Sequence, residues 1–162
     1  MNRRWIWIGA GAALVVLVAA VVITVLATRD SQTDGPGDQF ERAAKAFHQQ
    51  YDTLAPKVAD ELGKASGGFS DPSFTAAQLD ARKLGEAFDA YGKAIAAVAF
   101  PEQAKAAAGD LVKATQAGGI VWTNAAGFFA KDQMQATLDK YQKQVESALA
   151  EREQTLRSAL AK

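Results

Sequence analysis

The chain has 162 residues, a length typical of one domain, and its 18 basic residues balance 18 acidic ones. With 49% hydrophobic and 22% charged residues, the composition is that of a globular protein. The absence of cysteine excludes disulfides, thiolate metal sites and a cysteine nucleophile. No acidic residue precedes Asp30, and the chain beyond residue 28 has 16 basic residues against 18 acidic ones. This balance argues against nucleic acid as a partner, because such proteins need a basic face.

An apolar run covers residues 5–27, without a charged side chain and with Thr24 as its only polar one. About 20 such residues span the hydrocarbon core of a bilayer, where only a helix satisfies every backbone polar group within one segment. Trp5 and Trp7 lie at one end of the run, and indole rings favour the headgroup region. The run therefore predicts one N-terminal transmembrane helix, with the lipid bilayer as its partner.

The charges on either side of this run predict its orientation. Arg3 and Arg4 precede it, whereas Arg29 is followed closely by acidic residues. The positive-inside rule then places residues 1–28 as a cytoplasmic stub and membrane anchor, with the C-terminal domain outside the cytoplasm. The alternative is a signal peptide that is cleaved near Ala27, which would release a secreted protein. The apolar run exceeds the usual 7–15 residues of a signal peptide, which favours the anchor.

A polar segment without large apolar residues, residues 29–38, is expected to be a flexible tether. The extracytoplasmic domain would then cover residues 39–162. Its first helix is expected to begin at a capping box, with Asp38 as the cap and Glu41 three residues on.

Pro56 lies inside this first helix and lacks a backbone donor, so a kink is expected near Leu54–Ala55. The apolar phase continues past it, which favours one helix that ends near residues 66–68. The apolar residues recur at steps of three and four, as on one face of a helix. They are Phe40, Ala44, Phe47, Tyr51, Leu54, Val58 and Leu62.

Two further helices are expected on either side of Phe100-Pro101, and the short link makes them antiparallel neighbours. The first of these begins near Asp71-Pro72 or Thr75. Gly118-Gly119 interrupts the second, which is either one helix with a close backbone approach at Gly118 or a helix broken there. The two apolar faces share a seven-residue rhythm. They comprise Ala77, Ala81, Leu84, Phe88, Tyr91, Ile95 and Val98, and then Ala104, Ala108, Leu111, Thr115, Gly118, Trp122 and Ala125.

The last helix is expected to begin at a second capping box, formed by Asp132 and Gln135. Its polar segment 151–154 is expected to extend past the core. Its apolar positions are Met134, Leu138, Tyr141, Val145, Leu149, Leu156 and Leu160. The predicted fold is all-α: the transmembrane helix, followed by an antiparallel up-down-up-down four-helix bundle.

One stretch of the chain resembles uncharacterised, Ala-rich, membrane-anchored or secreted helical proteins of high-GC Gram-positive bacteria. It runs over residues 88–95 to Phe100-Pro101 and continues with Ala104, Ala107 and Leu111, about a third of the chain. The resemblance implies an extracytoplasmic bundle and no particular activity.

The candidates for catalysis all have a simpler structural explanation. His48 is the only histidine and is expected on the flank of the bundle, without the partners of a catalytic triad. Met134 should lie about 20 Å from it, too far for a shared haem iron. The acidic residues Asp60, Glu61, Glu151 and Glu153 are expected on solvated faces. We therefore expect no catalytic residue, cofactor or metal, and a protein that is not an enzyme.

Aromatic residues near two loops form the predicted functional patch: Phe69, Phe74, Trp122, Phe128 and Phe129. Alternating helices bring both loops to the membrane-distal tip, where the rings either plug the core or contact an envelope protein. The sequence thus predicts a non-enzymatic interaction or structural module of the cell envelope. The alternative is a bundle that binds a small apolar ligand or lipid in a pocket lined by Phe88, Tyr91, Leu111 and Trp122.

Overall fold

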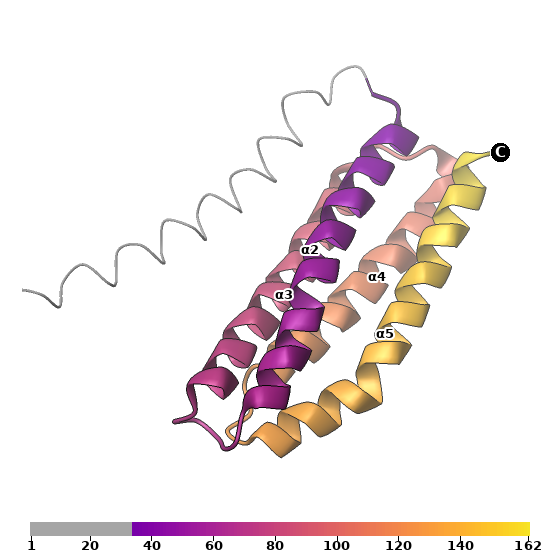
Figure 1. Ribbon diagram of the computed structural model, residues 1–162. Helices are drawn as coiled ribbons and strands as arrows, with labels where there is room; N and C mark the ends of the chain where they lie inside the picture. The colour runs from indigo at the N-terminus through magenta and orange to yellow at the C-terminus, as the bar shows by residue number, and fades with distance from the viewer. Residues whose placement is uncertain (1–33) are drawn as a thin grey trace, which may run out of the picture. The chain divides into compact units, whose positions relative to one another are not determined.

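The computed structural model describes residues 34–162, and this part of the chain is an antiparallel four-helix bundle without strands (Figure 1). This confirms the predicted all-α bundle. The predicted anchor, its orientation and the cleavage position near Ala27 lie outside the described residues. Within residues 34–162, no helix has the length and apolar character needed to cross a membrane.

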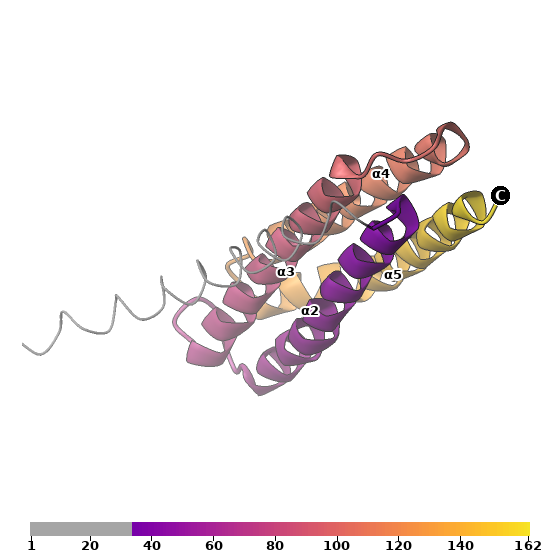
Figure 2. The ribbon, with the colours of Figure 1, turned by 90° about the horizontal axis from the view of Figure 1, so that it is seen from above.

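The four helices are α2 (Pro36–Lys64), α3 (Pro72–Ala97), α4 (Glu102–Ala125) and α5 (Lys131–Leu160). They run alternately up and down (Figure 1), and the view from above (Figure 2) shows how they lie beside one another. Each helix packs along its length against the next one in the chain, but α2 and α5 lie close at few positions. The α2–α3 and α4–α5 loops share one end of the bundle, and α2 begins at the other.

The core follows the predicted apolar faces closely. Every helix contributes fully or nearly fully buried side chains, and the largest are aromatic. They include Trp122, Phe40, Phe74, Phe88, Leu62, Leu84, Ile95, Leu111, Met134 and Leu156. Since stabilisation scales with buried apolar area, these few large side chains supply much of what the many alanines cannot.

The α3–α4 seam, the interface between these two helices, is packed through glycine. Helix α4 runs unbroken through Gly118, as the apolar phase predicted. A Cβ atom added at Gly118 would overlap the ring of Phe88, and one added at Gly85 would overlap the hydroxyl of Thr123. The same holds for Gly92 against Thr115. The glycines therefore allow the helices to approach more closely than any side chain would permit.

Both predicted capping boxes, at Asp38 and at Asp132, are wrong because the helices begin at other residues. Helix α2 begins at Pro36, so Asp38 lies in its first turn rather than before it. Proline suits the first position of a helix because its φ angle is already helical. An acidic side chain in the first turn is stabilised by the positive end of the helix dipole. Helix α5 begins at Lys131 after Ala130, with no side-chain cap at all. The predicted single helix through Pro56 is confirmed.

Candidate functional site

Two rings of the predicted aromatic patch meet at the end of the bundle. Phe69 in the α2–α3 loop and Phe129 in the α4–α5 loop lie with ring centroids 5.9 Å apart. Their side chains are 67% and 75% exposed, respectively. We call these two residues the aromatic pair. Their exposure means that they do not plug the core.

The other three members of the patch serve the core instead. Phe74 and Trp122 are fully buried, and Phe128 is half-buried against the same cluster. Their positions explain this, since Phe74 lies in the first turn of α3 and Trp122 on the buried face of α4. Of the five predicted residues, only the aromatic pair is exposed, and its two rings lie together where the two loops share one end of the bundle.

Asp71 fixes the loop that carries Phe69. One carboxylate oxygen accepts hydrogen bonds from the backbone N–H of Ser66 at 2.8 Å and of Gly67 at 3.2 Å, and from the Ser66 hydroxyl. The other accepts from the first N–H groups of α3, those of Ser73 and Phe74. These donors, led by the Ser66 N–H, lower the pKa of Asp71 to about 2. One side chain thus caps α3 and holds the preceding loop.

The second loop is fastened to the first helices. The side-chain amide of Gln78 in α3 donates to the carbonyl oxygens of Ala126 at 3.1 Å and Phe128 at 2.6 Å. Lys131 donates to the carbonyl oxygen of Ala65 at 2.6 Å, which joins α5 to the end of α2. The aromatic pair is therefore held on an ordered surface by four helices.

A second feature, which sequence reasoning missed, is the α2–α5 seam, the interface between the first and last described helices. Three polar contacts bridge it. Arg157 pairs with Glu41 at 2.7 Å, the Nε2 atom of His48 lies 3.0 Å from both carboxylate oxygens of Glu153, and Tyr51 donates to Glu146 at 2.6 Å. The backbones of α2 and α5 lie close at few positions, and these side-chain hydrogen bonds and charge pairs join the two helices.

Glu153 contradicts the prediction that the polar segment 151–154 is solvated and extends past the core. It is only 3% exposed, between the apolar positions Leu149 and Leu156. Burial alone raises the pKa of its carboxyl group, but the hydrogen bonds from His48 and Tyr91 and the nearby positive charges outweigh it, so the pKa lies below its ordinary value. The signal was present in the sequence, since residue 153 lies in the same helical phase as its apolar neighbours.

His48 is bound to this carboxylate, although part of its ring faces solvent as predicted. Its side chain is 44% exposed. The hydrogen bond to Glu153 raises the pKa of His48 above its usual value, against the opposing effect of burial. Within residues 34–162, His48 has no hydroxyl partner that could serve as a nucleophile. The pair can hold a proton, but its arrangement provides no complete catalytic triad.

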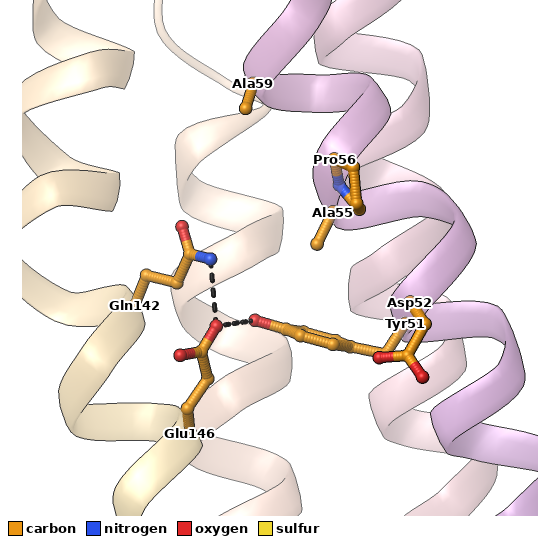
Figure 3. A pocket seen from close by; sticks show the side chains of 7 residues that line it. All are labelled: Tyr51, Asp52, Ala55, Pro56, Ala59, Gln142 and Glu146. Carbon is orange, nitrogen blue, oxygen red and sulfur yellow. Dashed lines mark hydrogen bonds between the residues drawn. The ribbon is translucent and has the colours of Figure 1, made fainter.

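A groove opens where α2 and α5 diverge, next to the last of the three polar contacts (Figure 3). Its volume is about 300 Å³. It is lined by Tyr51, Asp52, Ala55, Pro56, Ala59, Gln142 and Glu146. None of these belongs to the pocket predicted from the sequence, whose four residues are buried in the core.

No protein-family model, no curated protein and no solved structure matches the chain. Within the described residues, no group of three or more His, Asp or Glu side chains is placed to hold a metal ion.

Proposed function

We propose that this protein is a membrane-tethered module whose helical bundle lies outside the cytoplasm and binds a protein of the cell envelope, without catalysing a reaction. The aromatic pair carries the proposal. Two large apolar rings exposed side by side on ordered loops lose contact with water only when a partner covers them. Aromatic side chains are also enriched at the energetic centres of protein interfaces.

The position of the aromatic pair supports the same function. Both loops lie at the end of the bundle opposite to the start of α2 at Pro36. If residues 5–27 span the bilayer, this arrangement presents the pair away from the membrane, where another envelope protein can reach it. The apolar run and the arginines before it support that topology. A mature protein that begins at Thr28 would contradict the anchor and leave a secreted binding module.

The alternative function, binding of an apolar ligand inside the bundle, has less support. It needs space between Phe88, Tyr91, Leu111 and Trp122. All four side chains are buried at 3% exposure or less. The Phe88 ring also occupies the space beside Gly118 that a ligand would have used.

A photo-crosslinking residue in place of Phe129, in the full chain within its native envelope, tests the proposal directly. We expect one discrete adduct with an envelope protein. In a second chain with Phe69→Ser added, the adduct should be lost while the melting temperature stays unchanged. Ile120→Ser is the matched control, because this residue is 60% exposed on the flank of α4. An adduct that survives Phe69→Ser, or no adduct at all, would contradict a binding role for the pair.

A further inference from the structure

We propose that the groove between α2 and α5 binds a small alkylammonium ion, whose charged group lies between the Glu146 carboxylate and the ring of Tyr51. This site is separate from the aromatic pair, so its test is independent of the function proposed above. The groove has a suitable size and a negative charge, and one carboxylate oxygen of Glu146 accepts no hydrogen bond from the described residues.

The groove has the form of a small binding site. Figure 3 shows the Tyr51 ring nearly edge-on, reaching from α2 toward α5, with Ala55, Pro56 and Ala59 on one side of its plane. The ring is held in place, because its hydroxyl donates to Glu146. A volume of about 300 Å³ is at the lower limit of the range for small-molecule sites. The small side chains of α2 leave room above the ring for an apolar group.

The negative charge of the groove favours a cation. Glu146 accepts hydrogen bonds from two neutral groups, the Tyr51 hydroxyl at 2.6 Å and the Gln142 amide at 2.9 Å, both at the same oxygen. Within residues 34–162, its other oxygen accepts no hydrogen bond and no basic side chain pairs with it. Asp52, at the edge of the groove, adds a second negative charge; it interacts electrostatically with His48, but within residues 34–162 no lysine or arginine pairs with it. No lysine or arginine lines the groove.

The other carboxylates of the seam differ in this respect. Glu41 pairs with Arg157, and Glu153 has both His48 and Arg157 within 4 Å. Glu146 is the carboxylate of the three polar contacts whose charge remains uncompensated by the described residues. A half-buried carboxylate in this situation favours a cation from solution.

The Tyr51 ring favours an organic ammonium ion over other cations. An aromatic face attracts an organic cation, an interaction that a desolvated site strengthens. Pro56 has no N–H group, and it lines the groove together with Asp52. An alkyl or aryl chain would then cover the alanines.

Benzylammonium and the neutral benzyl alcohol, which differ at the charged group, form a suitable pair of probes. The full chain, in a maltoside detergent that itself carries no ammonium group, is titrated while amide NMR signals are recorded. We expect benzylammonium to cause saturable shifts at Ala55, Ala59 and Gln142. Benzyl alcohol should bind at least about ten times more weakly, since a hydrogen bond to a charged group contributes about that factor or more to the affinity.

Variants then locate the site. Glu146→Gln keeps the shape of the side chain and should weaken benzylammonium binding about tenfold, as should Tyr51→Leu, which removes the ring. Glu86→Gln, at an exposed position of α3, makes the same change of charge elsewhere and should leave binding unaltered. Equal binding of the two probes, equal losses in Glu86→Gln and Glu146→Gln, or no saturable shift up to the solubility limit would each overturn the proposal. Unchanged amide spectra outside the groove establish that the variants remain folded.

Discussion

Two interfaces of the same bundle are built in opposite ways. The α3–α4 seam brings backbones together through Gly85, Gly92 and Gly118, with Phe88 filling the remaining space. The α2–α5 seam holds its helices apart and joins them by polar side chains. Close packing tolerates few substitutions and opens only with the whole domain. The polar contacts of the α2–α5 seam are partly buried or exposed rather than enclosed. Such a seam can open locally, so we expect the bundle to open there first.

The largest effect should come from overpacking the α3–α4 seam. Gly118→Val places a branched side chain where the Phe88 ring lies, and we expect a loss of about 3 kcal/mol in the free energy of unfolding. The control is Gly109→Val on the exposed face of the same helix, where a Cβ atom meets nothing within 4 Å. It should change stability by no more than about 0.5 kcal/mol. Urea unfolding followed by circular dichroism measures both, and similar values would contradict the close packing at Gly118.

Removal of the buried carboxylate tests the other seam. Glu153→Ala leaves the Tyr91 hydroxyl and His48 without their acceptor, so we expect a loss of about 2 kcal/mol, less than for a fully enclosed ion pair because His48 faces water. Glu151→Ala, two residues earlier at a side chain that is 68% exposed, is the matched control. Its effect should stay below about 0.5 kcal/mol. If both variants are equally stable, Glu153 does not hold the seam together.

A smaller effect should follow pH. The pKa of His48 is raised in the folded state, so its contribution to stability is complete below its unfolded value of 6.5 and is lost as pH rises through the folded pKa. The pKa of Glu153 is lowered, so its contribution is present above its unfolded value of 4.5 and is lost as pH falls through the folded pKa. Asp52 also raises the pKa of His48, while Arg157 lowers it. The pair should therefore stabilise the bundle best in weakly acidic solution.

His48→Gln isolates this contribution. The stability difference between this variant and the natural chain should be larger near pH 6 than near pH 9, by no more than about 1 kcal/mol because water screens the half-exposed ring. Melting temperatures at the two pH values measure it. A difference that is independent of pH would mean that His48 contributes through packing alone.

The two seams also show how far the sequence could predict the structure. Steps of three and four residues located all four helices and most of the core, because burial of one apolar stripe determines which face turns inward. The glycine at 118 was recognisable for the same reason, since the apolar phase continued on both sides of it. The exposure of each ring in the aromatic patch depends on where the helices begin, and Phe74 falls inside α3.

The burial of Glu153 was not predicted, because a polar side chain is usually solvated even where its helical phase matches an apolar face. A carboxylate on an apolar stripe becomes buried only if partners from other helices satisfy it, here His48 on α2 and Tyr91 on α3. Those partners are 105 and 62 residues away in the chain, and no local pattern relates them. The groove beside Tyr51 could not be predicted from the sequence either, since it depends on how far α5 diverges from α2.

Native-state hydrogen exchange on the full chain tests most directly whether the two seams differ. Amides of α5 between residues 138 and 150 should exchange through local openings whose free energy lies clearly below that of global unfolding. Amides of α3 and α4 around Gly85 and Gly118 should exchange only with global unfolding. Equal protection of the α5 and α3 amides, or an α3–α4 seam that opens first, would contradict the expectation that the α2–α5 seam opens before the rest of the bundle.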